Sequence, residues 1–123
     1  MTPLDIAREA VTAAADKKAI RCVLQDLRGL SDLCDYQLVC SGENERQTRA
    51  IADSIEERCR RIGNIRPVAV EGKQSGNWIM IDFGSTLIHI FYDAVRNYYA
   101  LESLWPKAKL LPLSPGDEAK APR

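Results

Sequence analysis

The sequence predicts an α/β domain in which a mixed five-stranded sheet is flanked by helices. The main observation is in residues 77–91, where two runs of β-branched and aromatic residues flank Gly84-Ser85. This pattern is typical of a β-hairpin, and a glycine at the first of two turn positions favours a type II′ turn. Three further short apolar segments and two long stripes at helical spacing complete the prediction.

The hairpin register sorts its side chains onto two faces, because neighbouring residues of a strand point in opposite directions. With Gly84-Ser85 as the turn, Trp78 lies opposite Phe91 and Met80 lies opposite His89. One face is apolar enough to lie under helices and carries Ile79, Ile81, Phe83, Ile88 and Ile90. The other, which we call the aromatic face, carries Trp78, Met80, Asp82, Leu87, His89 and Phe91. This mixed composition is unusual for a core and for a solvated surface, so we expect the aromatic face to meet a partner.

The first helix is predicted to begin at Thr2-Pro3. Threonine is a good N-cap, proline suits the first helical position, and Asp5 lies near the positive end of the helix dipole. The apolar stripe of this helix consists of Leu4, Ala7, Ala10, Val11 and Ala14. The charged residues 16–18 are expected to form an exposed turn at its end.

Two strands are predicted next. In residues 19–27, Ile20, Cys22 and Leu24 alternate with the residues between them. Residues 28–35 contain several turn formers and are expected to be a loop. Residues 36–40 form the second strand, which ends at Ser41-Gly42.

The second helix has the clearest pattern in the sequence. Asn44 is its expected N-cap, with Gln47 three residues later, and Gly63 is its expected C-terminal stop. Its buried stripe consists of Thr48, Ile51, Ala52, Ile55, Cys59 and Ile62.

The remaining elements are shorter. Residues 65–71 are predicted to be a third strand, and Pro67 favours an edge position for it. A helix capped by Asp93 is expected to follow the hairpin and to run to Trp105, where Pro106 closes it. We expect residues 1–112 to form one domain, and the polar residues 113–123 to be a disordered tail.

The composition excludes several classes of protein. The 123 residues are 46% hydrophobic, and 17 basic residues balance 17 acidic ones. This balance argues against sequence-specific or bulk electrostatic binding to nucleic acid. We expect no signal peptide and no membrane span, because neither pattern is present. Four cysteines without a zinc-binding spacing are expected to be reduced thiols in the cytoplasm, with Cys22, Cys40 and Cys59 on apolar faces.

An enzymatic function finds little support in the sequence. His89 is the only histidine and lies in the middle of a strand, and no nucleophile triad, phosphate-binding loop or dinucleotide fingerprint is present. Residues 83–85 resemble the turn that opens a nucleotidyltransferase site. That chemistry needs closely spaced carboxylates to hold metal ions, and no acid follows the turn before Asp93. We therefore expect no catalysis, no metal and no cofactor.

A series of ordered motifs resembles the ribosomal silencing factor family, also called RsfS or Iojap-like. The resemblance extends from Ala10 to Trp105. Its motifs are Asp35-Tyr36, Ser41-Gly42, Arg46-Gln47, Ala50-Ile51-Ala52, Glu71-Gly72, Trp78, Asp82-Phe83-Gly84, His89-Ile90-Phe91, Arg96, Tyr98, Leu101-Glu102 and Leu104-Trp105. The family usually has an acid after the hairpin glycine, where this chain has Ser85, so a contact made by that acid is not expected here.

The resemblance implies a nucleotidyltransferase-like fold without the catalytic acids, and a translation repressor. Members of the family bind the large ribosomal subunit through ribosomal protein L-fourteen. They sterically block the small subunit and lower translation in starvation or stationary phase. The alternatives are a nucleotidyltransferase-like enzyme that uses Gly84-Ser85, and a scaffold that only forms a homodimer through the aromatic face.

The resemblance also implies partner-binding residues: Lys73, Trp78, His89 and the segment from Arg96 to Tyr98 would lie at or near the docking surface. The aromatic face adds Met80 and Phe91 to the predicted partner-binding residues. The hairpin register reaches Trp78 and His89 independently of the resemblance. A central tryptophan suits a protein–protein contact, because it buries a large area at a low cost in side-chain entropy.

Overall fold

The computed structural model describes residues 1–113, so the predicted tail lies outside the described residues from Ser114 onwards. In chain order, the elements are α1 (Pro3–Asp16), β1 (Ile20–Asp26), β2 (Tyr36–Gly42), α2 (Glu45–Gly63), β3 (Ala69–Glu71), β4 (Trp78–Asp82), β5 (Thr86–Tyr92), α3 (Asp93–Tyr99), the 3-10 helix η1 (Leu101–Leu104) and β6 (Lys109–Leu111).

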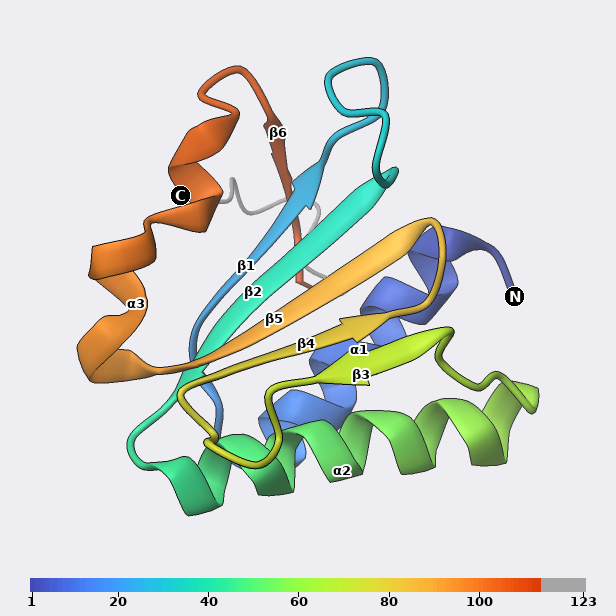
Figure 1. Cartoon of the computed structure of the whole chain (residues 1–123). Helices are drawn as coiled ribbons and strands as arrows, with labels where there is room; N and C mark the ends of the chain where they lie inside the picture. Colours follow the sequence, from blue (N-terminus) through green and yellow to red (C-terminus); the bar gives the residue numbers. More distant parts are fainter. Residues whose placement is uncertain (114–123) are drawn as a thin grey trace.

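The strands form one mixed sheet in the order β3-β4-β5-β2-β1-β6 (Figure 1). The central pair β2 and β5 is parallel, and every other neighbouring pair is antiparallel. The mixed α/β fold is therefore confirmed. The predicted number of five strands is wrong, because the described residues contain a sixth, β6, which pairs with β1. Its three residues are too short a run to show a strand period.

The two long helices begin where their caps were predicted. The Thr2 hydroxyl accepts a hydrogen bond from the Asp5 amide while the Asp5 carboxylate accepts one from the Thr2 amide. The Asn44 side chain accepts from the amide of Gln47. At the end of α2, Gly63 is still helical and Asn64 takes the left-handed conformation at φ 52°. Asparagine tolerates this conformation better than most residues, so the helix ends one residue later than predicted.

The hydrophobic core lies between the sheet and the pair α1 and α2. Figure 1 shows these helices together below the sheet, whereas α3 lies next to the end of β5. The side chains of Ile79, Ile81, Ile88 and Ile90 are fully buried in this core, as the hairpin register predicted. The predicted stripe of α2 is buried apart from Ile62, which is 45% exposed near the end of the helix.

The hairpin has the predicted two-residue turn. The amide of Phe83 donates to the carbonyl of Thr86 at 2.9 Å. Gly84 has φ +93°, the positive value that the first position of a type II′ turn requires. The turn therefore fixes the register of β4 and β5, and with it the side chains that share a face.

The segments on either side of the hairpin differ from the prediction. The third strand is limited to Ala69–Glu71, although the amide of Val68 also donates to the carbonyl of Asp82 at 2.7 Å; Pro67 before it has no amide hydrogen to donate. It does lie at the edge of the sheet, as Pro67 predicted. The predicted helix from Asp93 to Trp105 is two helices, since Ala100 takes a left-handed conformation at φ 49° between α3 and η1. Asp93 is the first helical residue rather than the cap.

Candidate protein-docking face

The aromatic face is formed by β4 and β5, in the predicted register. Trp78 pairs with Phe91, Met80 pairs with His89, and the next pair towards the turn is Asp82 with Leu87. Cross-strand neighbours lie on the same face of a sheet, so these side chains form one continuous patch. Since α1 and α2 pack on the other face, neither of these helices covers it.

The side chain of Trp78 is held in one orientation by three rings. Its indole Nε1–H donates to Nδ1 of His89 at 3.0 Å. Its ring stacks on Phe91, with centroids 5.2 Å apart, and lies 4.6 Å from the ring of Tyr99. Trp78 remains half-buried. Because the indole N–H is already bonded, the part of Trp78 that faces solvent is an apolar ring surface.

His89 is the buried hydrogen-bond partner that orients Trp78. Only 6% of the residue is exposed, and burial lowers its pKa from 6.5 to about 4. The imidazole is therefore neutral near pH 7, and Nδ1 has no proton because it accepts from Trp78. A neutral, buried imidazole with this partner orients the tryptophan and is not placed to act as a surface base.

One end of the aromatic face is bordered by α3, which a buried arginine attaches to the sheet. Only 1% of Arg96 is exposed. Its Nη1 donates to the carbonyl of Arg21 at 2.5 Å and to the hydroxyl of Ser41 at 3.0 Å. Its Nε donates to the Glu102 carboxylate at 3.1 Å. The charge is thus paired and its donors are used, which is the condition under which an arginine is stable in a protein interior.

The side chain of Arg21 also binds α3 to the sheet. The register of β1 and β2 shifts between Ile20 and Val23, and Arg21 has φ 54° at this bulge. A left-handed backbone is unfavourable for arginine, so surrounding contacts must compensate for it. The guanidinium of Arg21 donates to Asp93 and to Asn97, both at 2.9 Å, at the start and the middle of α3.

This attachment exposes two tyrosines beside the tryptophan. Tyr98 is 86% exposed and Tyr99 is 43% exposed, and their rings meet edge to face at 5.2 Å. Leu104 of η1 is 60% exposed in the same part of the chain. Together with Trp78, the two tyrosines form an aromatic surface. Sequence reasoning missed Tyr99, although its three-residue spacing from Arg96 is the helical spacing that brings both side chains to the sheet.

The predicted partner-binding residues thus fall into three groups. Trp78 and Met80 are half-buried on the aromatic face, and Tyr98 is exposed next to it. Beneath them lie His89, Phe91 and Arg96, of which Phe91 is fully buried. These three can position the surface but do not offer a large contact area themselves.

Lys73 belongs to the third group, because it lies elsewhere on the molecule. Its Nζ is 2.7 Å from the Asp53 carboxylate and 2.6 Å from that of Glu56, both on α2. The loop that carries it is tied to the same helix, since the Thr48 hydroxyl donates to the carbonyl of Gly76 at 2.7 Å. The structure therefore does not bring Lys73 to the aromatic face.

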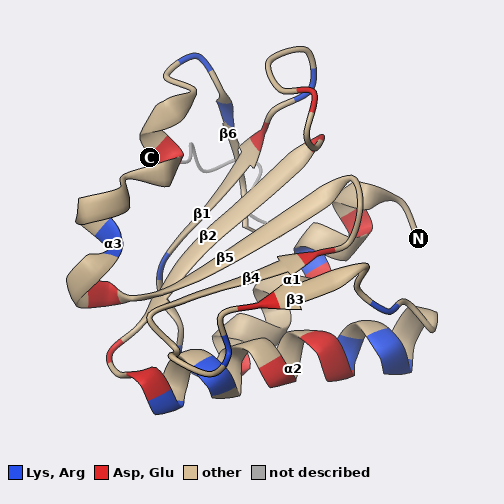
Figure 2. Cartoon of the chain, in the orientation of Figure 1, with Lys and Arg blue, Asp and Glu red and all other residues tan. Residues whose placement is uncertain are grey.

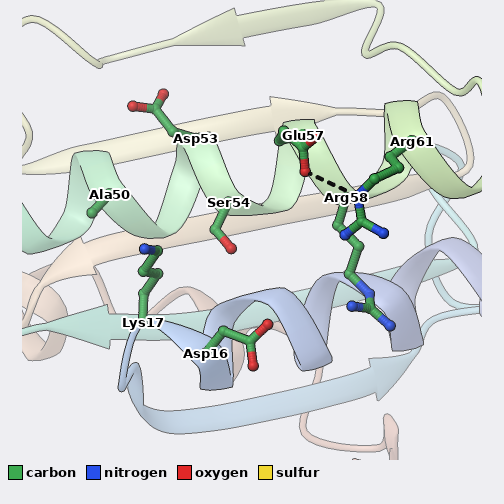
Figure 3. Close-up of a pocket in the computed structure, with 8 residues that line it drawn as sticks. All are labelled: Asp16, Lys17, Ala50, Asp53, Ser54, Glu57, Arg58 and Arg61. Carbon is green, nitrogen blue, oxygen red and sulfur yellow. Dashed lines mark hydrogen bonds and ion pairs between the residues drawn. The ribbon is translucent and has the colours of Figure 1, made fainter.

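Two grooves lined by residues of the described part of the chain lie on the side of α2. One is lined by Asp16, Lys17, Ala50, Asp53, Ser54, Glu57, Arg58 and Arg61 (Figure 3). Several of these groups bind other parts of the protein: Arg58 donates to Glu9 at 2.6 Å, Arg61 donates to Glu57 at 3.4 Å, and the hydroxyl of Ser54 donates to the carbonyl of Ala13 at 3.0 Å. The second is lined by Asp53, Glu56, Glu57, Arg60, Arg66, Pro67 and Lys73.

The charged side chains are distributed differently on α2 and on the central strands of the sheet. Figure 2 shows acidic and basic residues interspersed along α2, whereas the central strands β2 and β5 carry none. Residues 1–113 contain no group of three or more His, Cys, Asp or Glu side chains that could hold a metal ion. In the same residues, no helix is both long and apolar enough to cross a bilayer.

The fold and the face define the class of protein: an α/β protein whose sheet is covered by helices on one side and presents a candidate protein-docking surface on the other. The whole chain, residues 1–123, matches the RsfS family model, which is described as "Ribosomal silencing factor during starvation". The chain belongs to this family.

Individual relatives agree with this assignment. The ribosomal silencing factor RsfS of Bacillus subtilis is 34% identical over 116 residues, which cover 94% of this chain and 98% of that protein. The crystal structure of a Chromobacterium violaceum protein matches with a TM-score of 0.82 at 32% identity, and covers 86% of this chain and 88% of that one. A more distant relative is the mouse protein named "Mitochondrial assembly of ribosomal large subunit protein 1", 32% identical over 76 residues that cover 58% of this chain and 32% of the mouse protein.

Proposed function

We propose that this protein lowers translation in starvation or stationary phase by docking on the large ribosomal subunit in the cytoplasm. Ribosomal protein L-fourteen is the proposed contact. The bound protein then blocks association of the small subunit sterically. The family description, which names silencing during starvation, supports the setting, and the name of the mouse relative supports the large subunit as the partner.

The observation that carries the proposal is the surface formed by Trp78, Tyr98 and Tyr99. Aromatic side chains dominate the binding energy of protein interfaces because they bury a large area with few rotatable bonds. Here the indole is fixed by His89 and the tyrosines are carried by the anchored helix α3. A surface that is already ordered loses little conformational entropy on binding, so more of the contact energy remains as affinity.

Steric exclusion needs only a folded body at the right place. A domain of this length has a radius of gyration of about 13 Å. An object of that size bound on the intersubunit surface would occupy the space in which the small subunit makes its contacts. The mechanism therefore requires no catalytic group, which agrees with a family described by silencing rather than by a reaction.

The test is co-sedimentation of the purified protein with separated ribosomal subunits, followed by a subunit-joining assay. We expect the protein to pellet with large subunits only, to bind purified L-fourteen, and to reduce the fraction of joined ribosomes as its concentration rises. Pelleting with neither subunit would contradict the proposal. Pelleting without any effect on joining would contradict the steric mechanism.

The same preparation separates the two alternatives. A scaffold that uses the aromatic face only for a homodimer would show a dimer by light scattering and would not pellet with subunits. Metal-dependent turnover of nucleotides by the purified protein would instead support an enzyme that uses Gly84-Ser85.

A further inference from the structure

Two cysteines lie opposite each other in the centre of the sheet. In the antiparallel pair β1 and β2, Val23 pairs with Val39 and Leu24 pairs with Leu38. The register shifts between Ile20 and Val23, and continuing the regular part by one residue from the Val23–Val39 pair brings Cys22 opposite Cys40. By alternation, both cysteines point to the same side as Leu24 and Leu38. Cys40 is fully buried there, and Cys22 packs against the same cluster while remaining partly exposed.

Each of the two thiols shifts the pKa of the other, and this makes them chemically different. Hydrogen bonding to Cys40 lowers the pKa of Cys22, against the effect of burial, and the positive charge of Arg96 lowers this pKa further. The same bond and complete burial raise the pKa of Cys40 well above its ordinary value. Cys22 is therefore the thiol that forms a thiolate more readily and is partly exposed, and Cys40 is the fully buried thiol that stays protonated.

The other two cysteines provide an internal comparison. Cys34 and Cys59 are buried, and burial raises the pKa of both, that of Cys59 to about 11. Neither faces another cysteine across a strand pair in the register of the described sheet. Reactivity requires a thiolate that a reagent can reach, and these two thiols do not provide one.

We propose that Cys22 and Cys40 are a reversible redox pair, in which a hydroperoxide oxidises Cys22 and Cys40 then closes a disulfide between β1 and β2. The Cys22 thiolate attacks the peroxide oxygen, and the O–O bond breaks to give a sulfenic acid and one molecule of water or alcohol. The Cys40 sulfur then displaces hydroxide from the Cys22 sulfur, and the hydroxide leaves as water with the proton of Cys40. Two thiols are oxidised by two electrons and the peroxide is reduced.

The geometry of neighbouring strands permits this bond. Residues that face each other in an antiparallel pair have Cα atoms about 4.5 or 5.5 Å apart, which lies inside the range of about 4.4–6.8 Å found in disulfides. A thiol such as glutathione would reverse the reaction by attacking the sulfur of Cys22, the partly exposed member of the pair. The pair acts independently of the proposed docking function, because neither thiol lies on the aromatic face.

The experiment treats the reduced full chain with hydrogen peroxide, blocks remaining thiols and digests with trypsin. Cleavage after arginine places Cys22 in peptide 22–28, and Cys34 and Cys40 together in peptide 29–46. A Cys34→Ser background therefore makes the assignment unique. We expect peptides 22–28 and 29–46 to be found linked, with a mass lower by two hydrogens than their sum, and to separate after dithiothreitol.

Substitutions provide the controls. Cys22→Ser and Cys40→Ser should each abolish the linked product, whereas Cys59→Ser should leave its yield unchanged. Cys22 is partly exposed, so Cys22→Ser keeps the fold even if Cys40→Ser does not. The inference is overturned if peroxide yields no linked peptides, if it drives Cys22 to a sulfinic acid without linkage, or if the linkage involves Cys59.

Discussion

Tyr98→Ala separates binding from stability more clearly than any other substitution at the proposed docking surface. Tyr98 is 86% exposed, and its ring contact is the edge-to-face one with Tyr99 at 5.2 Å. Losing one exposed aromatic pair should cost about 0.5–1 kcal/mol of folding stability, against a typical total of about 5–15. If the ring is central to the interface, truncation should cost at least about 2 kcal/mol of affinity, which is roughly thirtyfold in Kd.

Trp78→Ala is expected to behave differently, because the structure gives this side chain internal contacts. Two ring contacts and one hydrogen bond, each worth about 0.5–1.5 kcal/mol, amount to roughly 2–4 kcal/mol of stability. The substitution should therefore lower both the melting temperature and the affinity for large subunits. If only Trp78→Ala were measured, a loss of binding would not show whether a contact with the ribosome was lost or the fold was disturbed.

The assay is a titration of large subunits with each variant, read by co-sedimentation, together with thermal unfolding followed by circular dichroism. Leu33→Ala is the matched control, because Leu33 is 75% exposed in the loop before β2, at the opposite end of β2 from α3. Its Kd and melting temperature should stay near those of the wild type. A wild-type Kd for a folded Tyr98→Ala protein would refute the placement of the docking surface beside α3.

Three further predictions concern the support of this face. Ile81→Asp should lower stability by several kcal/mol because Ile81 is fully buried, whereas Met80→Asp on the half-exposed side should cost much less; equal melting temperatures would contradict the assignment of faces. Burial lowers the pKa of His89 from 6.5 to about 4 in the folded protein. Between these two pH values the unfolded chain binds a proton at His89 that the folded protein does not. The free energy of unfolding therefore falls as the pH falls from 6.5 to 4, by about 3 kcal/mol at the lower end. Urea unfolding across the window should show this loss in the wild type and less of it in His89→Gln, and parallel curves would argue against a buried neutral imidazole. Gly72→Ala should destabilise strongly, since a Cβ there would lie 1.9 Å from the Trp78 carbonyl oxygen, while Gly84→Ala, with open space around it, should cost only about 1 kcal/mol of backbone strain; thermal unfolding of the two variants compares them directly.

Local patterns were sufficient to predict much of the fold. The helix caps at Thr2 and Asn44 and the turn at Gly84-Ser85 depend on residues within a few positions of each other, so their signals are visible in the sequence. The turn in turn fixed the pairing of β4 with β5 and therefore the two faces of the hairpin. Prediction failed where tertiary contacts override a local signal. β6 is a strand only because β1 offers it an edge, and the left-handed Ala100 interrupts a segment that reads as one helix.

Only part of the candidate site could be predicted, because alternation along a strand is a local signal and burial is not. Alternation along β4 placed Trp78 and Met80 on the aromatic face, and it also placed His89 and Phe91 there, but it could not tell that α3 would bury Phe91. Burial depends on which element packs on a face, and that element is attached by contacts between distant residues. The predicted role of Lys73 as a partner contact stays a prediction; its carboxylate partners on α2 could not be seen from the sequence spacing.

The sequence by itself thus determined the class of the fold, the register of the hairpin and, through its motifs, the family. The tertiary structure alone decided which members of the aromatic face reach solvent. The physical reason lies in the attachment of α3. Arg96 bonds Ser41, which is 55 residues away in the sequence, and the carbonyl of Arg21, which is 75 residues away. It also bonds Glu102 of η1. Such bonds depend on where the chain returns in space, and no periodicity along the sequence records them.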